Sequence, residues 1–192
     1  MYFCIAVFSG FRVCDLVGAR PGTKYKNNQY PHWTGLKWSD VYEKDGKTFK
    51  DMIELKELKT GHMRKVFLSN KSKEYIAYYV EKYHPNTKSS EYIFLNRQKN
   101  RLSAATIDDF IKEVTCECGI EGNYSTHSLR KTCVYHMYQG LCEKNGEEMA
   151  LAKCIKFTGH KSIAAFLSYL GLDRREKEEG NRIFEEYWGD TF

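Results

Sequence analysis

Six side chains in this sequence are of types that could hold and attack a phosphodiester. They are two arginines, two histidines, a lysine and a tyrosine: Arg12, Lys59, His127, Arg130, His160 and Tyr169. When one oxygen of a phosphodiester is displaced, negative charge concentrates on the phosphoryl group, so fixed cations and hydrogen-bond donors stabilise the transition state. A guanidinium can donate to two nonbridging oxygens and stays charged at any working pH. Arg12 and Arg130 could therefore clamp such a group, and His160 could donate a further hydrogen bond.

Tyr169 is the candidate nucleophile of this set. A phenol attacks weakly near neutral pH because its pKa is about 10, so it needs a proton acceptor or an electropositive pocket. His127 and Arg130 are three residues apart near an expected helix start, where free backbone N–H groups and the helix dipole favour an anion. Asp15 follows Arg12 by three residues on one face of an expected helix, and could hold the Arg12 guanidinium in position.

Each of these residues also has an ordinary structural explanation. Lys59 adjoins a Thr-Gly turn, Gly159 could simply end a helix before His160, and Tyr169 is one of 14 tyrosines. These explanations would have to hold for all six residues at once, so we favour the functional interpretation. Lys56 is a weaker candidate for the role of Lys59 because it lies further from the turn. The other four histidines are expected to be structural: His32, His62, His84 and His136.

The elements that position these side chains are expected to be mostly helices. Helical periodicity and capping residues predict helices over residues 2–8, 12–18 and 72–84, a helix that begins at Ser103, and helices over residues 125–140, 147–157 and 162–170. Ser9 is the expected N-cap of the second of these helices, and Ser103 that of the fourth. The apolar faces expected to enter the core are Tyr75, Ile76, Tyr79 and Val80, then Ile107, Phe110, Ile111 and Val114, and last Ile163, Phe166, Leu167 and Leu170.

Strand signals cluster in the N-terminal third of the chain. Residues 36–42 and 48–59 are expected strands around an Asp45-Gly46 turn, and Gly61 turns the chain back into residues 64–68. Residues 92–94 could add a short strand. With no alternation of strands and helices, the expected fold class is mainly α with a small antiparallel β-sheet.

The composition is ordinary for a globular protein that could meet a polyanion. Hydrophobic residues make up 42% of the chain, and the net charge is +5, which permits nucleic-acid binding without establishing it. Seven scattered cysteines without a signal peptide indicate reduced thiols in a cytoplasm. Cys116 and Cys118 lack a second ligand pair at zinc spacing, so no metal is expected there.

Four motifs occur in a fixed order along the chain. They are SGFRVCDL at residues 9–16, LKTG at 58–61, THSLR at 126–130, and TGH at 158–160 with Tyr169 nine residues after His160. This ordered set resembles the catalytic domain of the tyrosine recombinases, the phage integrase family, from about residue 3 to residue 170. Each motif alone is weak, but their order and the His-to-Tyr spacing together are specific.

The resemblance implies a way to cut and rejoin DNA strands. Tyr169 would attack phosphorus to give a 3′-phosphotyrosine and a free 5′-hydroxyl, with His127 as base or proton relay. Lys59 would protonate the leaving 5′-oxygen, and an acid at the place of Asp15 supports Arg12. Because the covalent link retains the phosphodiester energy, no ATP, metal or other cofactor is expected.

The resemblance also implies a partner and an assembly. The partner is double-stranded DNA, bound by a homo-tetramer across two sites, with a monomer or weak oligomer without DNA and no membrane contact. Residues 1–172 are expected to be the catalytic domain of an enzyme in a prokaryotic cell or the host of a mobile element. Residues 173–192 are expected to be a tail that docks on a neighbouring protomer through Ile183, Phe184, Tyr187 and Trp188.

Two features depart from the family pattern. Its full-length members carry an N-terminal domain that clamps the far side of the DNA, and we expect that domain to be absent here. Residues 20–34 are expected to be an inserted surface loop, because the family usually passes almost directly from the arginine helix to the Trp-Ser-Asp segment at residues 38–40.

Two rival functions remain open at this point. A type IB topoisomerase uses a similar set of residues, but the integrase-like Gly159-His160 context and the small size disfavour it. The other rival is a DNA-binding remnant that has lost turnover. Relaxation of supercoils without strand exchange would favour the topoisomerase, and DNA binding without a covalent adduct would favour the remnant.

Overall fold

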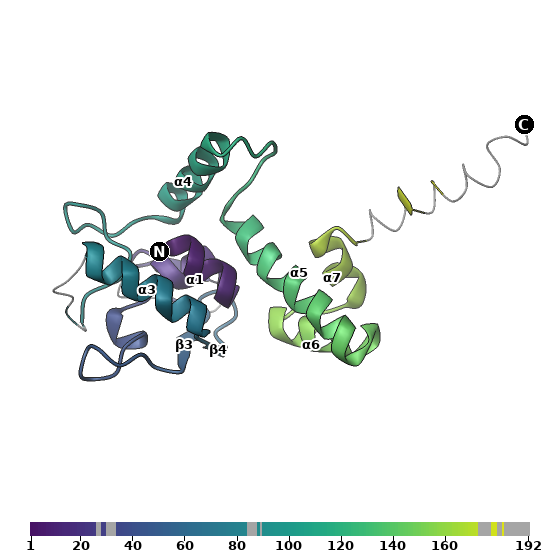
Figure 1. Ribbon diagram of the computed structural model, residues 1–192, viewed down its shortest axis with the longest axis horizontal. Coiled ribbons are helices and arrows are strands. Elements are labelled where there is room, and N and C mark those ends of the chain that lie inside the picture. Colours follow the sequence, from purple (N-terminus) through teal and green to yellow (C-terminus); the bar gives the residue numbers. More distant parts are fainter. Residues whose placement is uncertain are drawn as a thin grey trace, which may run out of the picture. The chain divides into compact units, whose positions relative to one another are not determined.

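The chain forms two compact units in the computed structural model, residues 1–133 and 134–192. Residues 1–25, 28–29, 34–83, 88, 90–172, 178–179 and 182 are described. The boundary between the units falls inside the long helix α5 (Thr126–Asn145). Figure 1 labels the main elements of both units. Among the described residues, every helix is too short or too polar to cross a lipid bilayer.

The first unit combines helices with two small antiparallel hairpins, of which Figure 1 labels β3 and β4. Its elements are α1 (Tyr2–Ser9), α2 (Val13–Val17), β1 (Lys24–Tyr25), β2 (Asn28–Gln29), the 3₁₀ helix η1 (Trp38–Asp40), β3 (Met52–Lys56), β4 (Met63–Phe67), α3 (Asn70–Tyr83), α4 (Ala104–Glu117) and the start of α5. Strands β3 and β4 pair in register from Met52 opposite Phe67 to Lys56 opposite Met63. The predicted hairpin and the predicted mainly helical fold class are confirmed.

One apolar cluster holds the first unit together. Helix α1 contributes Ile5 and α2 contributes Leu16, while Ile53 of β3, Ile76 of α3 and Ile107 of α4 complete its centre. Helix α1 packs on α3, and α2 packs on α4. Burying such side chains stabilises the unit by about 1.5–3 kcal/mol each, and it fixes the loop between α1 and α2 against the β3–β4 hairpin.

The second unit contains the rest of α5, helix α6 (Glu147–Thr158) and helix α7 (Ile163–Leu170). Its separate core is built from Val134, Tyr138, Ala150, Cys154 and Phe166. Helix α6 ends because Gly159 adopts a left-handed conformation, with φ of 76°. Ser162 then caps α7 by accepting from the Ala165 N–H at 3.2 Å.

Several sequence predictions about these elements were wrong. Ser9 does not cap α2: it ends α1, and its hydroxyl donates to the Ile5 carbonyl at 2.6 Å. Residues 36–42 are not a strand, because Asp40 accepts from the Lys37 N–H at 2.7 Å and closes a 3₁₀ turn. In residues 92–94 only Tyr92 forms a bridge, to Lys37.

The predicted apolar faces were also slightly too wide. Tyr75, Phe110 and Ile163 are about half exposed, because each stands at the edge of its helical stripe, where a 3.6-residue period carries the side chain out of the core. Ser103 does cap α4, as predicted, by accepting from the Thr106 N–H at 3.1 Å.

Other predictions fall partly or wholly outside the described part of the chain. In the predicted 20–34 loop, the described residues include the short hairpin of β1 and β2. His32, His84 and the apolar residues of the tail, Ile183, Phe184, Tyr187 and Trp188, lie outside the described residues.

Candidate active site

A left-handed glycine places the first candidate arginine. Gly10 has φ of 60° and ends α1, with its N–H donating to the Ala6 carbonyl. The chain then turns, and Arg12 becomes the N-cap residue of α2, with extended backbone angles. Arg12 and Asp15 therefore do not share a helix face in the way the sequence predicted.

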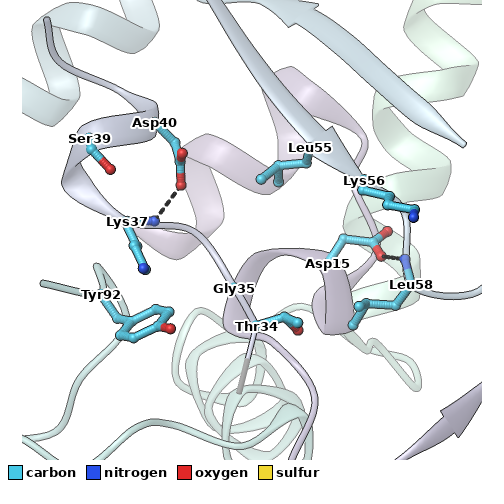
Figure 2. A pocket seen from close by; sticks show the side chains of 10 residues that line it. All are labelled: Asp15, Thr34, Gly35, Lys37, Ser39, Asp40, Leu55, Lys56, Leu58 and Tyr92. Atoms are coloured by element: carbon cyan, nitrogen blue, oxygen red, sulfur yellow. Dashed lines mark hydrogen bonds between the residues drawn. The ribbon is translucent and has the colours of Figure 1, made fainter. Parts of the chain in front are cut away.

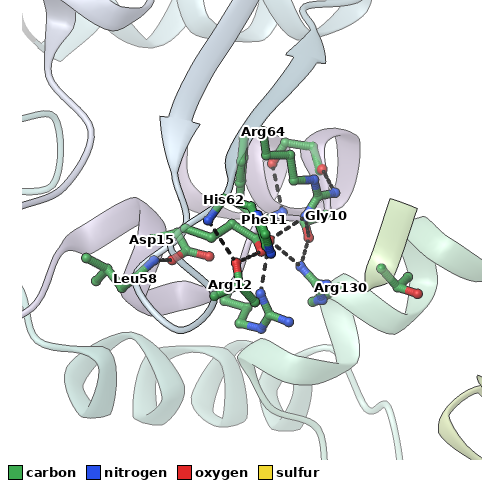
Figure 3. A network of polar contacts seen from close by, with 12 residues as sticks. Gly10, Phe11, Arg12, Asp15, Leu58, His62, Arg64 and Arg130 are labelled. Atoms are coloured by element: carbon green, nitrogen blue, oxygen red, sulfur yellow. Dashed lines mark hydrogen bonds and ion pairs between the residues drawn. The ribbon is translucent and has the colours of Figure 1, made fainter. Parts of the chain in front are cut away.

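The carboxylate that pairs with Arg12 is Glu57, which the sequence analysis did not select. Arg12 Nη1 lies 3.0 Å from Glu57 Oε1. Arg64 Nη1 donates to the same oxygen at 3.3 Å, and Arg130 Nη1 lies 4.0 Å from it. Three guanidinium groups thus converge on one anionic oxygen, beside the loop at Gly10 (Figure 3).

Burial strengthens the interactions of this cluster. Glu57, Arg64 and Arg130 are each less than a tenth exposed, and buried charges require partners. Burial by itself raises the pKa of Glu57. The hydrogen bond from Thr60 and the charges of Arg12, Arg64 and Arg130 outweigh burial, so the pKa of this carboxyl is lowered overall. Glu57 is therefore ionised at neutral pH.

Asp15 contacts the lysine turn as well as Arg12. Its Oδ1 accepts from the Leu58 N–H at 2.8 Å (Figure 2), which fixes the backbone directly before Lys59. Burial raises the pKa of Asp15, and the hydrogen bond from Leu58 works against that rise. Glu57 forms the ion pair with the Arg12 guanidinium, and Asp15 also interacts with Arg12 through the Arg12 charge and a hydrogen bond with the Arg12 backbone. The support of Arg12 by Asp15 therefore stays a prediction, and Asp15 reaches Lys59 through the backbone of Leu58.

Lys59 lies in the exposed turn that joins β3 to β4. The turn is closed by hydrogen bonds from the Gly61 N–H to the Glu57 carbonyl at 2.8 Å and from the Glu57 N–H to the His62 carbonyl at 2.9 Å. Lys56, the weaker candidate, is also exposed but stands in β3 itself. Only Lys59 therefore sits at the tip, where a loop side chain can reach a bound molecule.

His127 opens α5 near these cations. Its side chain is exposed, yet partial loss of solvent around the ring lowers the pKa of His127. The positive charges of Lys131, Arg130, Arg12 and Lys59 lower it further. The imidazole is therefore neutral at neutral pH and can accept a proton, which is what the predicted base requires.

His160 and Tyr169 lie together in the second unit. Their ring centroids are 4.7 Å apart. Thr158 Oγ1 lies 2.8 Å from the Cys154 carbonyl and 2.6 Å from His160 Nδ1. The Thr158 hydroxyl thus holds the imidazole through Nδ1, on the side of the ring away from Nε2.

Strand alternation could have identified the two missed residues. In β3 and its continuation, Ile53, Leu55 and Glu57 occupy inward positions, while Glu54 and Lys56 are exposed. In β4, Arg64 occupies an inward position in the same way. A charged residue at an inward strand position needs a partner of opposite charge or a hydrogen bond. The strand pattern in the sequence could therefore have identified Glu57 and Arg64 as buried, paired residues.

Comparison with known proteins decides the family. Residues 32–175, which include Lys59, His127, Arg130, His160 and Tyr169, match the phage integrase family. The chain belongs to the phage integrase family. It is 27% identical over 136 residues to the probable integrase/recombinase YoeC of Bacillus subtilis (strain 168), covering 70% of this chain and 68% of YoeC. The predicted family is confirmed.

Solved recombinase structures share the fold of this phage integrase family member. XerA recombinase superposes with a TM-score of 0.60 at 19% identity, covering 93% of this chain and 56% of XerA. XerH bound to difH before cleavage gives 0.59 at 20% identity, covering 96% and 46%. A lambda integrase dimer bound to a core site gives 0.53 at 17% identity, covering 88% and 50%. The chain spans about half the length of these solved chains.

Proposed function

We propose that this protein is a site-specific recombinase that cuts and rejoins double-stranded DNA through a 3′-phosphotyrosine at Tyr169. The observation that carries the proposal is the convergence of Arg12 and Arg130 toward one anionic oxygen in the first unit. Such a pair can stabilise the charge that develops on a phosphoryl group. The family of the chain supports the choice of DNA as substrate.

Each residue of the proposed site has a definite part in the first step. The Tyr169 oxygen attacks phosphorus and the bond to the 5′-oxygen breaks, while Arg12 and Arg130 hold the nonbridging oxygens. His127 takes the phenol proton, and Lys59 gives a proton to the leaving 5′-oxygen, so charge does not build up on either oxygen.

His160 has the proposed part of a further hydrogen-bond donor to the phosphate. Its Nδ1 contacts Thr158 Oγ1 at 2.6 Å, and Nε2 is the ring nitrogen that donates to a nonbridging phosphate oxygen. Attack of a 5′-hydroxyl from another strand then reverses the step, releases Tyr169 and joins the new pair of ends.

The proposed assembly is a homo-tetramer across two DNA sites. Its support comes from relatives: XerH was solved with its difH site, and lambda integrase was solved as a dimer on a core site. Mass photometry with and without a duplex that carries the target sequence measures the assembly. A protein that stays monomeric on DNA while it exchanges strands would refute this part of the proposal.

The chemistry is tested by trapping the covalent intermediate. Incubation with a pool of nicked duplexes should give a protein–DNA adduct that survives SDS, because the nick lets the 5′-fragment diffuse away. Tyr169→Phe should abolish the adduct because the nucleophilic oxygen is lost. Tyr135→Phe is the matched control, since it removes a phenol on α5 that accepts from Gln139 at 3.0 Å. An adduct that persists in Tyr169→Phe, or DNA binding with no adduct in the wild type, would refute the proposal.

A further inference from the structure

The carboxylate of Glu57 lies at the meeting point of the groups that the proposed reaction needs. It is 7% exposed, and it is two residues before Lys59 in the chain. Its Oε1 faces Arg12, Arg64 and Arg130 at 3.0, 3.3 and 4.0 Å. Building on the proposed function, we propose that Glu57 is a positioning residue that orients the two clamp arginines relative to the Lys59 turn.

The position of Glu57 is set by groups other than the clamp. Thr60 Oγ1 donates to its Oε2 at 2.7 Å. On the other side stands Arg64, whose Nη2 donates to the Ser9 carbonyl at 2.9 Å and whose Nη1 donates to the Gly10 carbonyl at 3.1 Å. The Arg64 guanidinium also stacks over the Phe11 ring, 4.9 Å from its centroid. Arg64 and Thr60 therefore anchor the carboxylate whether or not Arg12 is engaged elsewhere.

Glu57 in turn restricts the more exposed Arg12. The Arg12 side chain is 23% exposed, and a long side chain at the surface loses rotamer freedom when it is held. Its Nη1 atom is shielded from solvent and forms the ion pair with Glu57. A guanidinium is planar and has five N–H donors. The ion pair between Arg12 Nη1 and Glu57 therefore fixes the plane of the Arg12 guanidinium, and its remaining N–H groups can donate to a phosphate in that plane.

Arg130 is held through the same loop. Its Nη1 donates to the Gly10 carbonyl, which also accepts from Arg64. Three guanidinium groups this close repel one another, and the one carboxylate offsets that repulsion. Glu57 therefore connects the Lys59 turn, Arg12 and Arg130 through contacts made without DNA, which reduces the ordering that substrate binding must bring about.

The test compares four variants of the full chain with wild type. Glu57→Gln keeps the shape and removes the charge, whereas Glu57→Asp keeps the charge on a shorter side chain. The double variant Glu57→Gln with Arg64→Gln removes both members of the buried ion pair, so that the Arg64 charge is not left without its carboxylate. Glu54→Gln is the matched control, since Glu54 pairs with Lys65 at 2.7 Å on the exposed face of the same hairpin.

The first readout separates chemistry from DNA binding. In single-turnover adduct formation, Glu57→Gln should lower the cleavage rate about 100-fold through a misplaced clamp. The DNA affinity of Glu57→Gln should stay within about threefold of the wild-type value, because many phosphate contacts contribute to the binding energy. Glu57→Asp should recover part of the rate, and Glu54→Gln should behave as wild type.

The double variant distinguishes positioning from plain stability. It should unfold at a higher temperature than Glu57→Gln, because it lacks the buried Arg64 charge that has lost its carboxylate, but its cleavage should remain as slow. Recovery of cleavage in the double variant would mean that Glu57 merely neutralises Arg64, and would overturn the proposal. Wild-type cleavage in Glu57→Gln would overturn it as well.

A second readout does not depend on cleavage. In ¹⁵N NMR spectra of the DNA-free protein, the Arg12 guanidinium should show hindered rotation in wild type and free rotation in Glu57→Gln. Free rotation in wild type would overturn the proposal. A wild-type protein without any adduct would refute the proposed function instead, and the guanidinium spectra would then still judge the role of Glu57.

Discussion

At the scale of single residues, the first unit shows how one buried carboxylate can organise three arginines. Glu57 is ionised because its partners lower its pKa more than burial raises it. Asp15, which is also buried, accepts from the backbone N–H of Leu58. The two buried carboxylates thus have different main partners, decided by which donors lie within reach.

His127 carries a pH prediction at this scale. Loss of solvent and then the charges of Lys131, Arg130, Arg12 and Lys59 lower its pKa below the ordinary value of about 6.5. A group with a lowered pKa releases its proton at lower pH, so the base form is already present below pH 6.5. We expect the imidazole of the DNA-free protein to titrate below about 6.5 in an NMR titration.

Lys131→Ala provides the control for that titration. Removing this positive charge should move the His127 midpoint upward, toward the ordinary value. A midpoint above the ordinary value in wild type, or no response to Lys131→Ala, would contradict the assignment of His127 as a neutral base beside several cations.

At the scale of elements, the site depends on how helices end. Helix α1 stops at the left-handed Gly10, and helix α6 stops at the left-handed Gly159. The first turn places Arg12 and offers the carbonyl that both Arg64 and Arg130 bind. The second turn places His160 against Thr158. Two helix C-terminal turns thus hold candidate catalytic side chains.

Gly10→Ala tests the first turn. An added Cβ would meet Cys133 Sγ at 3.0 Å, and the φ of 60° is strained for alanine. We expect the free energy of unfolding to fall by about 1–2 kcal/mol from the backbone conformation alone. The contact between the added Cβ and Cys133 Sγ should lower it further. Gly46→Ala is the matched control, because Gly46 has φ of 67° with open space around it.

Thermal and urea unfolding of both glycine variants measure the difference. Gly10→Ala should also slow adduct formation, whereas Gly46→Ala should not, because only Gly10 anchors the arginines. Equal stability losses and equal cleavage rates in the two variants would contradict a special role for the Gly10 turn.

At the scale of the whole molecule, each unit has its own apolar core. The first core supports the arginines and the Lys59 turn, and the second supports His160 and Tyr169. Helix α5 belongs to both units, since its first turns carry His127 and Arg130 and its later turns carry Val134 and Tyr138.

Phe166→Ala tests this division of the core. Phe166 is completely buried in the second unit. Its truncation to alanine should therefore lower the free energy of unfolding of that unit by about 3–5 kcal/mol. Hydrogen exchange should accelerate in α6 and α7 while the β3–β4 hairpin keeps its protection. Ile163→Ala, an exposed position on the same helix, should leave exchange nearly unchanged. Equal loss of protection in the hairpin would show that the molecule unfolds as one unit.

The sequence by itself determined the local elements and the family. Helical periodicity and a capping serine predicted α4, and turn residues predicted the β3–β4 hairpin, because these signals act between residues close in the chain. The ordered motifs identified the phage integrase family, and the spacing of these motifs predicted the six candidate site residues. The predictions that Tyr75, Phe110 and Ile163 are buried were wrong. Helical periodicity gives the direction of the apolar face, but it does not give the width of the helix surface that neighbouring elements bury.

Only the tertiary structure decided which charges meet. Asp15 binds Leu58 across 43 residues, Arg64 binds Gly10 across 54, and Arg130 binds Gly10 across 120. Such pairs form because a buried charged group must be hydrogen-bonded or paired with whatever group packing brings within reach. Packing is set by the whole core, so a motif identified the arginines but only the folded chain assigned Glu57 as their common carboxylate.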